Sequence, residues 1–245
     1  MPRFFVDTGA IADGEVRIEG GDAYHIARAL RMAVGDTVEV CDGEGVEYSC
    51  RLCRIRDEEC VCEVLSSRIS EREMPIEVTL YMAMPKGDKL ETVVQKAVEL
   101  GASHIVAYES ERCIKRPAPE KAAKLVERLS RIAREAAKQC GRARLPEVRG
   151  IIGFSDMLSE LSGFELSLFC YEGEGTLPLR SVLESRARAA SVSAIVGSEG
   201  GFSEREAEAI CKAGAVAVGL GPRILRCETA PEYVLSALSY RFEMK

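Results

Sequence analysis

The sequence predicts an α/β protein in two parts: a small β-barrel, followed by a larger, mostly parallel sheet with helices on both faces. Three observations support this prediction. Before Pro75 the chain contains short alternating runs that are typical of antiparallel strands. After Pro75, continuous apolar strands alternate with helical stretches, as a parallel sheet requires. The polar, charged stretch "SSRISEREMP" separates the two parts.

Composition limits the class of protein. The chain has 245 residues, of which 47% are hydrophobic, which is enough to bury a full core. The opening "MPRFFVDTGAIADGEV" has too short an apolar run for a signal peptide, and no stretch reaches the ~18 apolar residues of a membrane span. We therefore expect a cytoplasmic protein without membrane contact.

In the first part, "DTVEVCDGEGVEYSCRLCRI" shows two alternating runs around Asp42–Gly45, which is a hairpin signal, and "CVCEVL" predicts a further strand. The cysteines of this region leave two alternatives. Cys50 and Cys53 make a Cys-x-x-Cys pair close to Cys60 and Cys62, which is a spacing found in zinc sites. However, an alternating strand puts Cys50 and Cys53 on opposite faces, which favours small, reduced, buried residues and no metal.

In the second part, strands and helices alternate to the end of the sequence. A helix over 89–100 is stopped by Gly101. Capping boxes at 203–206 (Ser-x-x-Glu) and 229–232 (Thr-x-x-Glu) mark the expected starts of two later helices. The expected strands cover 76–84, 104–108, 165–171, 192–197 and 215–220.

Charge is segregated along the chain, although the net charge of −6 by itself argues against a nucleic-acid partner. Residues 112–149 hold 12 Lys and Arg against 4 Glu. Within them, helical spacing aligns one stripe, made of Arg128, Arg131, Arg134, Lys138 and Arg142. His25, Arg28 and Arg31 repeat this spacing in the first part. The stripe is either a solvated helix face or a contact for a polyanion, and its few acids favour the polyanion.

The stretch "IVGSEGGFSEREAEAI" predicts a strand, a glycine turn and a helix. Glycines at such a junction usually cradle phosphate, which the acidic Glu199 in this turn would repel. The sequence contains neither the Gly-x-Gly-x-x-Gly of dinucleotide folds nor a P-loop. The turn therefore favours a ligand that is rich in hydrogen-bond donors or carries positive charge.

A second irregular stretch, "GLGPRILRCETA", bends at its glycines and proline. Ile224 and Leu225 could wall an apolar slot, while Arg223 and Arg226 could reach phosphates or a carboxylate. The alternative is a packed loop with solvated arginines.

These stretches also occur in order in one known family. The chain contains "PRFF", "VGDTVEVCDGEG", "KGDKLETVVQKAVELGASHI", "SERC", "EAAKQCGR", "GSEGGFSEREAEAICKAGA" and "LGPRILRCETA". With these motifs the sequence resembles the RsmE family, SPOUT-superfamily enzymes that methylate N3 of a uridine in small-subunit (16S) ribosomal RNA. The resemblance spans nearly the whole chain.

The resemblance implies a fold and partners. Residues 1–72 would form a PUA-like or OB-like β-barrel that binds RNA, and residues 73–245 would form a SPOUT methyltransferase domain. The SPOUT domain would be a parallel sheet whose C-terminal end is threaded as a trefoil knot, a rare arrangement. Family members are homodimers, and the expected partner is ribosomal RNA within an assembled 30S particle.

The implied cofactor is S-adenosylmethionine, bent and held by three loops, and no metal is implied. This cofactor has a sulfonium, an ammonium and hydroxyls but no phosphate, so a carboxylate at Glu199 is compatible with it. This chain has Ser198 where proline is usual in the family and Cys227 where threonine is usual. The implied cofactor-binding residues are Phe169, Tyr171, Gly197, Glu199, Gly200, Gly201, Leu220, Gly221, Ile224, Leu225, Thr229 and Ala230.

Methyl transfer from a sulfonium to nitrogen is an in-line displacement, so positioning should dominate the catalysis. Uridine N3 must also lose a proton, and Glu199 and Arg226 are the catalytic candidates. Glu199 could instead meet a donor on the ligand or hold Arg226. Other functions stay open: a methyltransferase for another RNA, a protein or a small molecule, and a non-catalytic RNA-binding module. The residues assigned to RNA binding are Arg3, His25, Arg28, Arg31, Arg112, Arg131, Arg134, Lys138 and Arg142.

Overall fold

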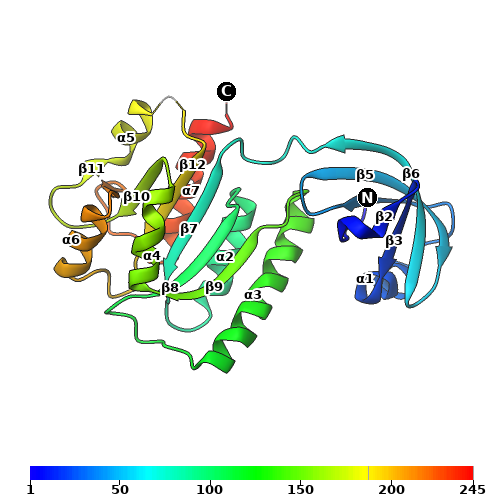
Figure 1. Cartoon of the computed structure of the whole chain (residues 1–245), viewed down its shortest axis with the longest axis horizontal. Coiled ribbons are helices and arrows are strands. Elements are labelled where there is room, and N and C mark those ends of the chain that lie inside the picture. The colour runs from blue at the N-terminus through cyan, green and yellow to red at the C-terminus, as the bar shows by residue number, and fades with distance from the viewer. Residues whose placement is uncertain (187, 245) are drawn as a thin grey trace. The chain divides into compact units, whose positions relative to one another are not determined.

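The structure is a computed structural model that describes residues 1–186 and 188–244 (Figure 1). Contacts between residues divide the chain into two units. The first unit combines Met1–Glu73 with Ala137–Leu145, and the second combines Met74–Ala136 with Pro146–Lys245. Helix α3 (Pro119–Cys140) therefore contributes its last residues to the first unit.

The first unit is built on a six-stranded sheet in the order β1-β4-β5-β6-β3-β2. Neighbouring strands pair antiparallel, except that β1 and β4 are parallel. In the part of the chain that the structure describes, β1 and β2 stay as edges, so the predicted barrel is an open half-barrel. Its elements are β1 (Arg3–Phe5), η1 (Thr8–Ala10), β2 (Ile11–Ala12), β3 (Glu15–Glu19), α1 (Gly20–Tyr24), the π-helical η2 (His25–Ala29), β4 (Thr37–Cys41), β5 (Val46–Ile55) and β6 (Glu59–Ile69).

The predicted hairpin between β4 and β5 is confirmed. A side-chain oxygen of Asp42 accepts the N–H groups of Glu44, Gly45 and Val46 at 2.8, 3.0 and 3.0 Å. Gly45 has a φ of 121°, which a residue with a side chain rarely adopts. The turn is therefore set by one carboxylate and by glycine, as its sequence predicts.

Three of the four cysteines that the sequence singled out lie in the core of the half-barrel. Cys50, Cys60 and Cys62 are fully buried in its core, whereas Cys53 is exposed. Cys50 and Cys53 therefore lie on opposite faces of β5, as strand alternation predicts. Burial raises the pKa of Cys50 to about 11 and that of Cys62 to about 12. Among the described residues, no group of three or more His, Cys, Asp or Glu is arranged to hold a metal ion.

Arg3 is buried inside the first unit, which contradicts its assignment to RNA binding. Its guanidinium donates to Glu39 at 2.9 Å, to Glu47 at 3.3 Å and to the carbonyl of Arg142 at 3.0 Å. Only 4% of its side-chain surface is exposed. The assignment is wrong because these internal partners use the donors that an RNA phosphate would need.

Lys138 and Arg142 also have internal partners, which removes them from the predicted RNA-binding stripe. Lys138 Nζ lies 2.9 Å from the Asp22 carboxylate and over the ring of Phe4. Arg142 follows the end of α3, is buried, and contacts the Glu73 carboxylate at 2.9 Å. Because both cations are neutralised within the first unit, the stripe ends before Lys138.

The second unit is built on a seven-stranded parallel sheet in the order β11-β13-β10-β12-β7-β8-β9. The five strands expected from the sequence are confirmed as β7, β8, β10, β12 and β13, whereas β9 and β11 were not predicted. The strands are β7 (Glu77–Ala83), β8 (His104–Glu109), β9 (Glu147–Gly153), β10 (Leu166–Cys170), β11 (Leu177–Pro178), β12 (Ser191–Val196) and β13 (Val216–Gly219).

Helices cover both faces of this sheet, and Figure 1 shows α4 on the face opposite α2 and α7. The helix predicted over 89–100 is confirmed as α2, and Gly101 follows it with a φ of 88°. None of the helices in the described chain is long and apolar enough to cross a membrane. The remaining elements are α2 (Lys89–Glu99), α4 (Phe154–Glu160), η3 (Leu161–Gly163), α5 (Leu179–Ser185), α6 (Glu204–Lys212) and α7 (Thr229–Phe242).

One of the two predicted capping boxes is present. The Ser203 hydroxyl accepts the Glu206 N–H at 3.3 Å, and the Glu206 carboxylate accepts the Ser203 N–H at 3.0 Å. The box predicted from Thr229 is wrong, because Thr229 is already the first residue of α7. Its N–H instead donates to the carbonyl of Arg226 at 2.9 Å. A main-chain hydrogen bond therefore closes a turn in the segment before α7.

The strand order brings separate loops together. Strands β13, β10 and β12 are adjacent and parallel, so their carboxyl ends meet at one edge of the sheet. The loops after these strands lead to β11, α6 and α7. Ligand sites of open α/β sheets lie at such edges, where the order of the strands reverses. The fold therefore predicts a site at the carboxyl ends of β10 and β12.

Replacing Glu73 with alanine should destabilise the first unit. The substitution takes away the carboxylate partner of Arg142 and the acceptor of the Ala143 and Arg144 N–H groups, at 2.9 and 3.0 Å. Removing one partner of a buried pair costs about 3–5 kcal/mol. Urea unfolding followed by circular dichroism measures the loss, with the exposed Glu71→Ala as control. Equal stability of the two variants would contradict this role.

Candidate active site

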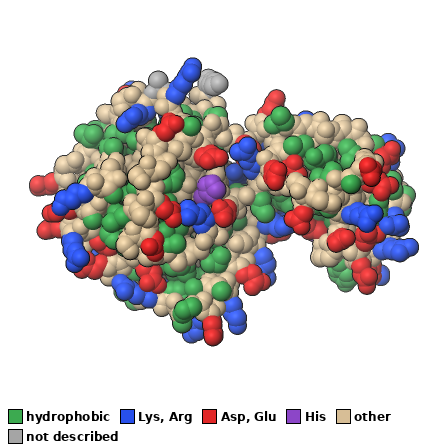
Figure 2. Space-filling view, viewed as in Figure 1, with side chains coloured by type: hydrophobic (Ala, Val, Ile, Leu, Met, Phe, Trp, Pro, Cys, Tyr) green, Lys and Arg blue, Asp and Glu red, His purple; other side chains and the backbone are tan. Residues whose placement is uncertain are grey.

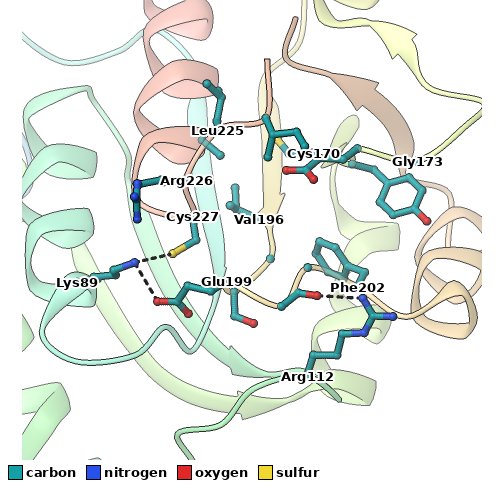
Figure 3. Close-up of a pocket in the computed structure, with 18 residues that line it drawn as sticks. Lys89, Arg112, Cys170, Gly173, Val196, Glu199, Phe202, Leu225, Arg226 and Cys227 are labelled. Atoms are coloured by element: carbon teal, nitrogen blue, oxygen red, sulfur yellow. Dashed lines mark hydrogen bonds and ion pairs between the residues drawn. The ribbon is translucent and has the colours of Figure 1, made fainter. Parts of the chain in front are cut away.

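A cavity of about 570 Å³ opens at the carboxyl ends of β10 and β12 (Figure 3). Its walls come from the turn after β12, the loop after β10 and the segment before α7. The volume lies within the roughly 300–1,000 Å³ of small-molecule sites. The lining residues are Lys89, Arg112, Cys170, Tyr171, Glu172, Gly173, Val196, Gly197, Ser198, Glu199, Gly200, Gly201, Phe202, Ile224, Leu225, Arg226, Cys227 and Ala230.

Glycines let the turn after β12 pack closely against its neighbours. A Cβ at Gly197 would lie 2.8 Å from the ring of Phe202, and one at Gly200 would lie 3.0 Å from Arg112 Cβ. Gly201 has a φ of 62°. Arg112, from the loop after β8, donates to the Gly200 carbonyl at 3.0 Å. That loop therefore supports the turn from outside, and a side chain at Gly200 would displace it.

Glu199 is anchored by the residues that lead into α2. The Lys86 N–H lies 3.2 Å from each carboxylate oxygen, and the Lys89 ammonium lies 3.0 Å from Oε1. Partial burial raises the pKa of Glu199, but hydrogen bonds and the charge of Lys89 outweigh it and hold this pKa below its usual value. Glu199 is therefore an ionised carboxylate whose partners are these two lysines, and it does not hold Arg226.

Lys89 also binds a carboxylate from the segment before α7. Its ammonium lies 3.0 Å from Glu228 Oε2, to which the Cys227 thiol donates at 3.2 Å. Hydrogen bonds to the two glutamates raise the pKa of Lys89. A backbone hydrogen bond and the contacts with Cys227 and Lys89 lower the pKa of Glu228 to about 2. Burial raises the pKa of Cys227 to about 12, so its thiol is neutral at pH 7.

Three aromatic rings support the loop after β10. The rings of Phe169 and Tyr171 stack at 5.0 Å, and Phe202 meets Phe169 edge-on at 4.8 Å. Gly173 leaves room for Tyr171, because a Cβ at Gly173 would lie 2.3 Å from that ring. Phe169 itself is fully buried and holds Tyr171, which lines the cavity.

The segment before α7 contributes a cation to the cavity. Figure 3 shows Arg226 on the side where Lys89, Cys227 and Glu199 lie. Within residues 1–186 and 188–244, no hydrogen bond or ion pair of its guanidinium is found. Leu225 is half-buried at the cavity, whereas Ile224 is 82% exposed. The apolar slot expected from both residues is therefore walled by Leu225, with Ile224 at its rim.

The structure brings most of the assigned cofactor residues to this one cavity. Phe169 does not line the cavity but stacks on Tyr171, which does, and Thr229 lines a different groove, between α5 and α7. Leu220 and Gly221 belong to the bend before the cavity and do not line it. The assigned residues that line the cavity are Tyr171, Gly197, Glu199, Gly200, Gly201, Ile224, Leu225, Arg226 and Ala230.

One cation of this site, Lys89, was not predicted from the sequence. Lys89 lies in "KGDK", which follows β7, and only the pairing of β7 with β12 places it beside Glu199. Charged residues directly after a strand of a parallel sheet are the signal that could have found it. Glu228, the second carboxylate partner of Lys89, was also not predicted. The other lining residues not assigned from the sequence are Cys170, Glu172, Gly173, Val196, Ser198, Phe202 and Cys227.

The basic residues of the second unit are partly available for an anionic partner. On α3, Arg131 is exposed and Arg134 is partly exposed. Arg128 forms an ion pair with Glu91 at 2.8 Å. Arg112 lines the cavity, close to the turn after β12.

The basic residues of the first unit lie on a mixed surface. His25, Arg28 and Arg31 are exposed, but Arg28 pairs in a fork with Asp57, at 2.6 to 3.1 Å. Arg31 has a φ of 51° and so ends the helical stretch that was expected to continue to it. Figure 2 shows acidic and basic side chains interspersed on the face that it presents.

Comparison with known proteins identifies the family. The family profile described as "RNA methyltransferase domain" matches residues 72–239, and the one described as "RNA methyltransferase PUA domain" matches residues 18–65. Ribosomal RNA small subunit methyltransferase E of Bacillus subtilis (strain 168) is 36% identical over 251 residues, which cover 100% of this chain and 98% of the relative. The chain belongs to the ribosomal RNA small subunit methyltransferase E family.

Further relatives and solved structures match over both units. The Mycobacterium tuberculosis relative is 32% identical, with 95% of this chain and 87% of the relative covered. The solved structure of the Neisseria gonorrhoeae enzyme, bound to S-adenosyl methionine, matches with a TM-score of 0.88 and 31% identity over 98% of this chain and 97% of that one. A solved structure from Legionella pneumophila, in complex with the cofactor SAM, matches with a TM-score of 0.86 and 28% identity. The match covers 97% of this chain and 96% of that one.

Proposed function

We propose that the protein transfers a methyl group from S-adenosylmethionine to N3 of a uridine in small-subunit (16S) ribosomal RNA. The observation that carries this proposal is the convergence of three loops on one cavity in a chain of the methyltransferase E family. The glycine turn of this cavity holds an ionised carboxylate, Glu199, which disfavours phosphate and suits a cationic ligand.

The residues of the cavity fit this cofactor chemically. When bound, S-adenosylmethionine supplies the methyl group on its sulfonium. Glu172 and Glu199 are anionic lining groups suited to its positive charges, and Val196 and Leu225 offer apolar surface. Gly201 exposes main chain among the lining residues, which lets a ligand approach closely.

Charge stabilisation, rather than proton removal by a strong base, is the role that the site supports. The low pKa of Glu199 makes it a weak base for the N3 proton. Arg226 has donors that are free in the described chain, and a guanidinium suits the negative charge that develops on the uracil oxygens. We therefore assign charge stabilisation to Arg226 and anchoring of the turn to Glu199.

RNA contact is proposed for both parts of the chain, with residues 1–72 as the RNA-binding domain and residues 73–245 as the methyltransferase domain. The PUA profile over residues 18–65 supports the first assignment. Arg3, Lys138 and Arg142 leave the RNA-binding set because of their internal partners. An assembled 30S particle is the proposed substrate. The residues kept in the set are His25, Arg28, Arg31, Arg112 and Arg131, which are exposed, and Arg134, which is partly exposed.

A homodimer is proposed through the groove between α5 and α7. This groove of about 790 Å³ is bordered by Tyr233 and Tyr240, whose exposed fractions are 45% and 72%. Large exposed aromatic residues beside an apolar groove are typical of interfaces. Sedimentation velocity separates such a dimer from the 26.7 kDa monomer.

The trefoil knot and a cytoplasmic location complete the proposal. After β13, the chain returns across β10 to α7, which packs against β12 and α2. The proposed knot rests on the family of the chain, in which the resemblance implies a threaded C-terminal end.

Two measurements test the proposed function. Isothermal titration calorimetry should detect binding of S-adenosylmethionine and S-adenosylhomocysteine but not of ATP. Transfer of a labelled methyl group should modify N3 of a uridine in 30S particles. Label only in tRNA would favour another RNA substrate, and label in protein would favour a protein methyltransferase. Absence of cofactor binding would leave a non-catalytic RNA-binding module.

Arg226→Lys should keep affinity for S-adenosylmethionine but lose most of the turnover. Lysine keeps the charge but not the planar fork of donors that two uracil oxygens require. We expect a loss of about 100-fold in kcat, as for removal of one charge-stabilising donor. Turnover should recover partly at high pH, where the N3 proton leaves without help. Wild-type turnover at pH 7 with saturating RNA would remove Arg226 from the mechanism.

Reversing two charges of α3 with Arg131→Glu and Arg134→Glu should weaken RNA binding and flatten its dependence on salt. Each phosphate that the protein no longer neutralises lowers the slope of log K against log salt by about 0.7–0.9. Filter binding between 50 and 200 mM salt, roughly the range in which such effects appear, measures the slope. Reversal of Arg205 and Lys212 on α6 is the charge-matched control. An equal slope for both double variants would show that the stripe is solvated surface.

A further inference from the structure

Lys89 joins two loops that come from different strands. Its ammonium lies 3.0 Å from Glu199, in the turn after β12, and 3.0 Å from Glu228, directly before α7. The second loop follows β13, and β10 lies between β12 and β13 in the sheet. Lys89 is itself the first residue of α2. One side chain therefore connects three segments around the cavity.

The other anchors of these carboxylates do not join the two loops. Glu199 is also held by the Lys86 N–H, which belongs to the approach to α2. Glu228 is also held by Cys227, its neighbour in the chain. Among the described residues, Lys89 is the side chain that forms ion pairs with both glutamates. The spacing between the loops therefore depends on this lysine.

The two carboxylates would repel each other without the lysine. Both contact the same ammonium, so they lie close together, and both are ionised at neutral pH. Glu199 would stay in place because it keeps the Lys86 N–H, so Glu228 is the group free to move. Arg226 precedes Glu228 by two residues and would move with it.

We propose that Lys89 is a positioning residue that sets the distance between the turn after β12 and the segment before α7, and thereby the placement of Arg226. The inference rests on the proposed function, because it takes this cavity as the S-adenosylmethionine site. Lys89 acts through Glu228, and its ammonium stays charged throughout. By neutralising the two carboxylates, Lys89 maintains cofactor affinity. By linking the two loops, it maintains turnover.

A second lysine of α2 provides a matched control. Lys96 pairs with Glu99 at 2.7 Å, and its side chain is 40% exposed against 31% for Lys89. Lys96 does not line the cavity. Lys96→Met therefore removes an ion pair from the same helix without separating the loops.

The experiment compares Lys89→Met, Lys89→Arg and Lys96→Met by calorimetry with S-adenosylmethionine and by methyl transfer to 30S particles. We expect Lys89→Met to lower both cofactor affinity and kcat at least tenfold. Arginine keeps the charge and can bind two carboxylates, so Lys89→Arg should recover most of both. Lys96→Met should resemble the wild type.

A double variant separates the two effects. Adding Glu228→Gln to Lys89→Met removes the repulsion between the two carboxylates but does not restore the link between the two loops. Cofactor affinity should therefore recover while kcat stays low. A structural ion pair would not produce this split. Glu228→Gln alone severs the link while Lys89 keeps Glu199, so it should lower kcat more than affinity.

Wild-type affinity and turnover in Lys89→Met would overturn the inference, as would equal losses in Lys89→Met and Lys96→Met. Circular dichroism and the melting temperature show whether Lys89→Met folds. If it does not, Glu228→Gln tests the inference instead, because a wild-type kcat in that variant would also overturn the inference. Failure of the wild-type protein to bind S-adenosylmethionine would instead contradict the proposed function. The two failures are therefore distinguishable.

Discussion

One ammonium group fixes the geometry of the cavity. Lys89 lies at the first position of α2, where the helix dipole disfavours a cation. The carboxylates of Glu199 and Glu228 offset this cost, at 3.0 Å each. The presence of a lysine at this position is therefore explained by its two ion pairs and not by the stability of α2. The negative charge of Glu199, in the glycine turn that leads into α6, is thereby balanced from the side by α2.

The sheet determines which groups this network can join. Pairing of β7 with β12 brings the start of α2 beside the glycine turn, and pairing of β10 with both β12 and β13 brings their following loops to the same edge. Buried strands of a parallel sheet cannot slide without exposing apolar residues, so the core fixes the positions at which these loops begin. Long-range charge contacts then adjust the loops. The core thus sets the approximate positions of the loops, and Lys89 sets the distance between them.

Signals between near neighbours in the sequence predicted many of the helices, strands and turns correctly. Most of the predictions that were wrong depend on contacts between distant segments. The hairpin at Asp42–Gly45 and the helix start at Ser203 depend on near neighbours, and both are confirmed. The open edges of the half-barrel, the burial of Arg142 and the partners of Lys89 depend on residues far away in sequence, with Arg142 and Glu73 69 positions apart. A charge pattern cannot distinguish a cation that faces solvent from one that pairs inside the fold, which is why the stripe along α3 was predicted too long.

Ser198 and Cys227, the two positions where the resemblance implies proline and threonine, have different physical consequences. Cys227 can act as the donor that a threonine hydroxyl would provide, because its thiol donates to Glu228 at 3.2 Å. Ser198 has no such compensation: its Oγ is buried, and no partner for it is found in the described residues. A buried hydroxyl without a partner costs about 1–3 kcal/mol, a cost that proline would avoid because it has no side-chain donor. The turn keeps its shape despite this cost because the contacts of Gly197 and the anchors of Glu199 involve other atoms. Both residues therefore alter the wall of the cavity while leaving Lys89 and its two carboxylates in place.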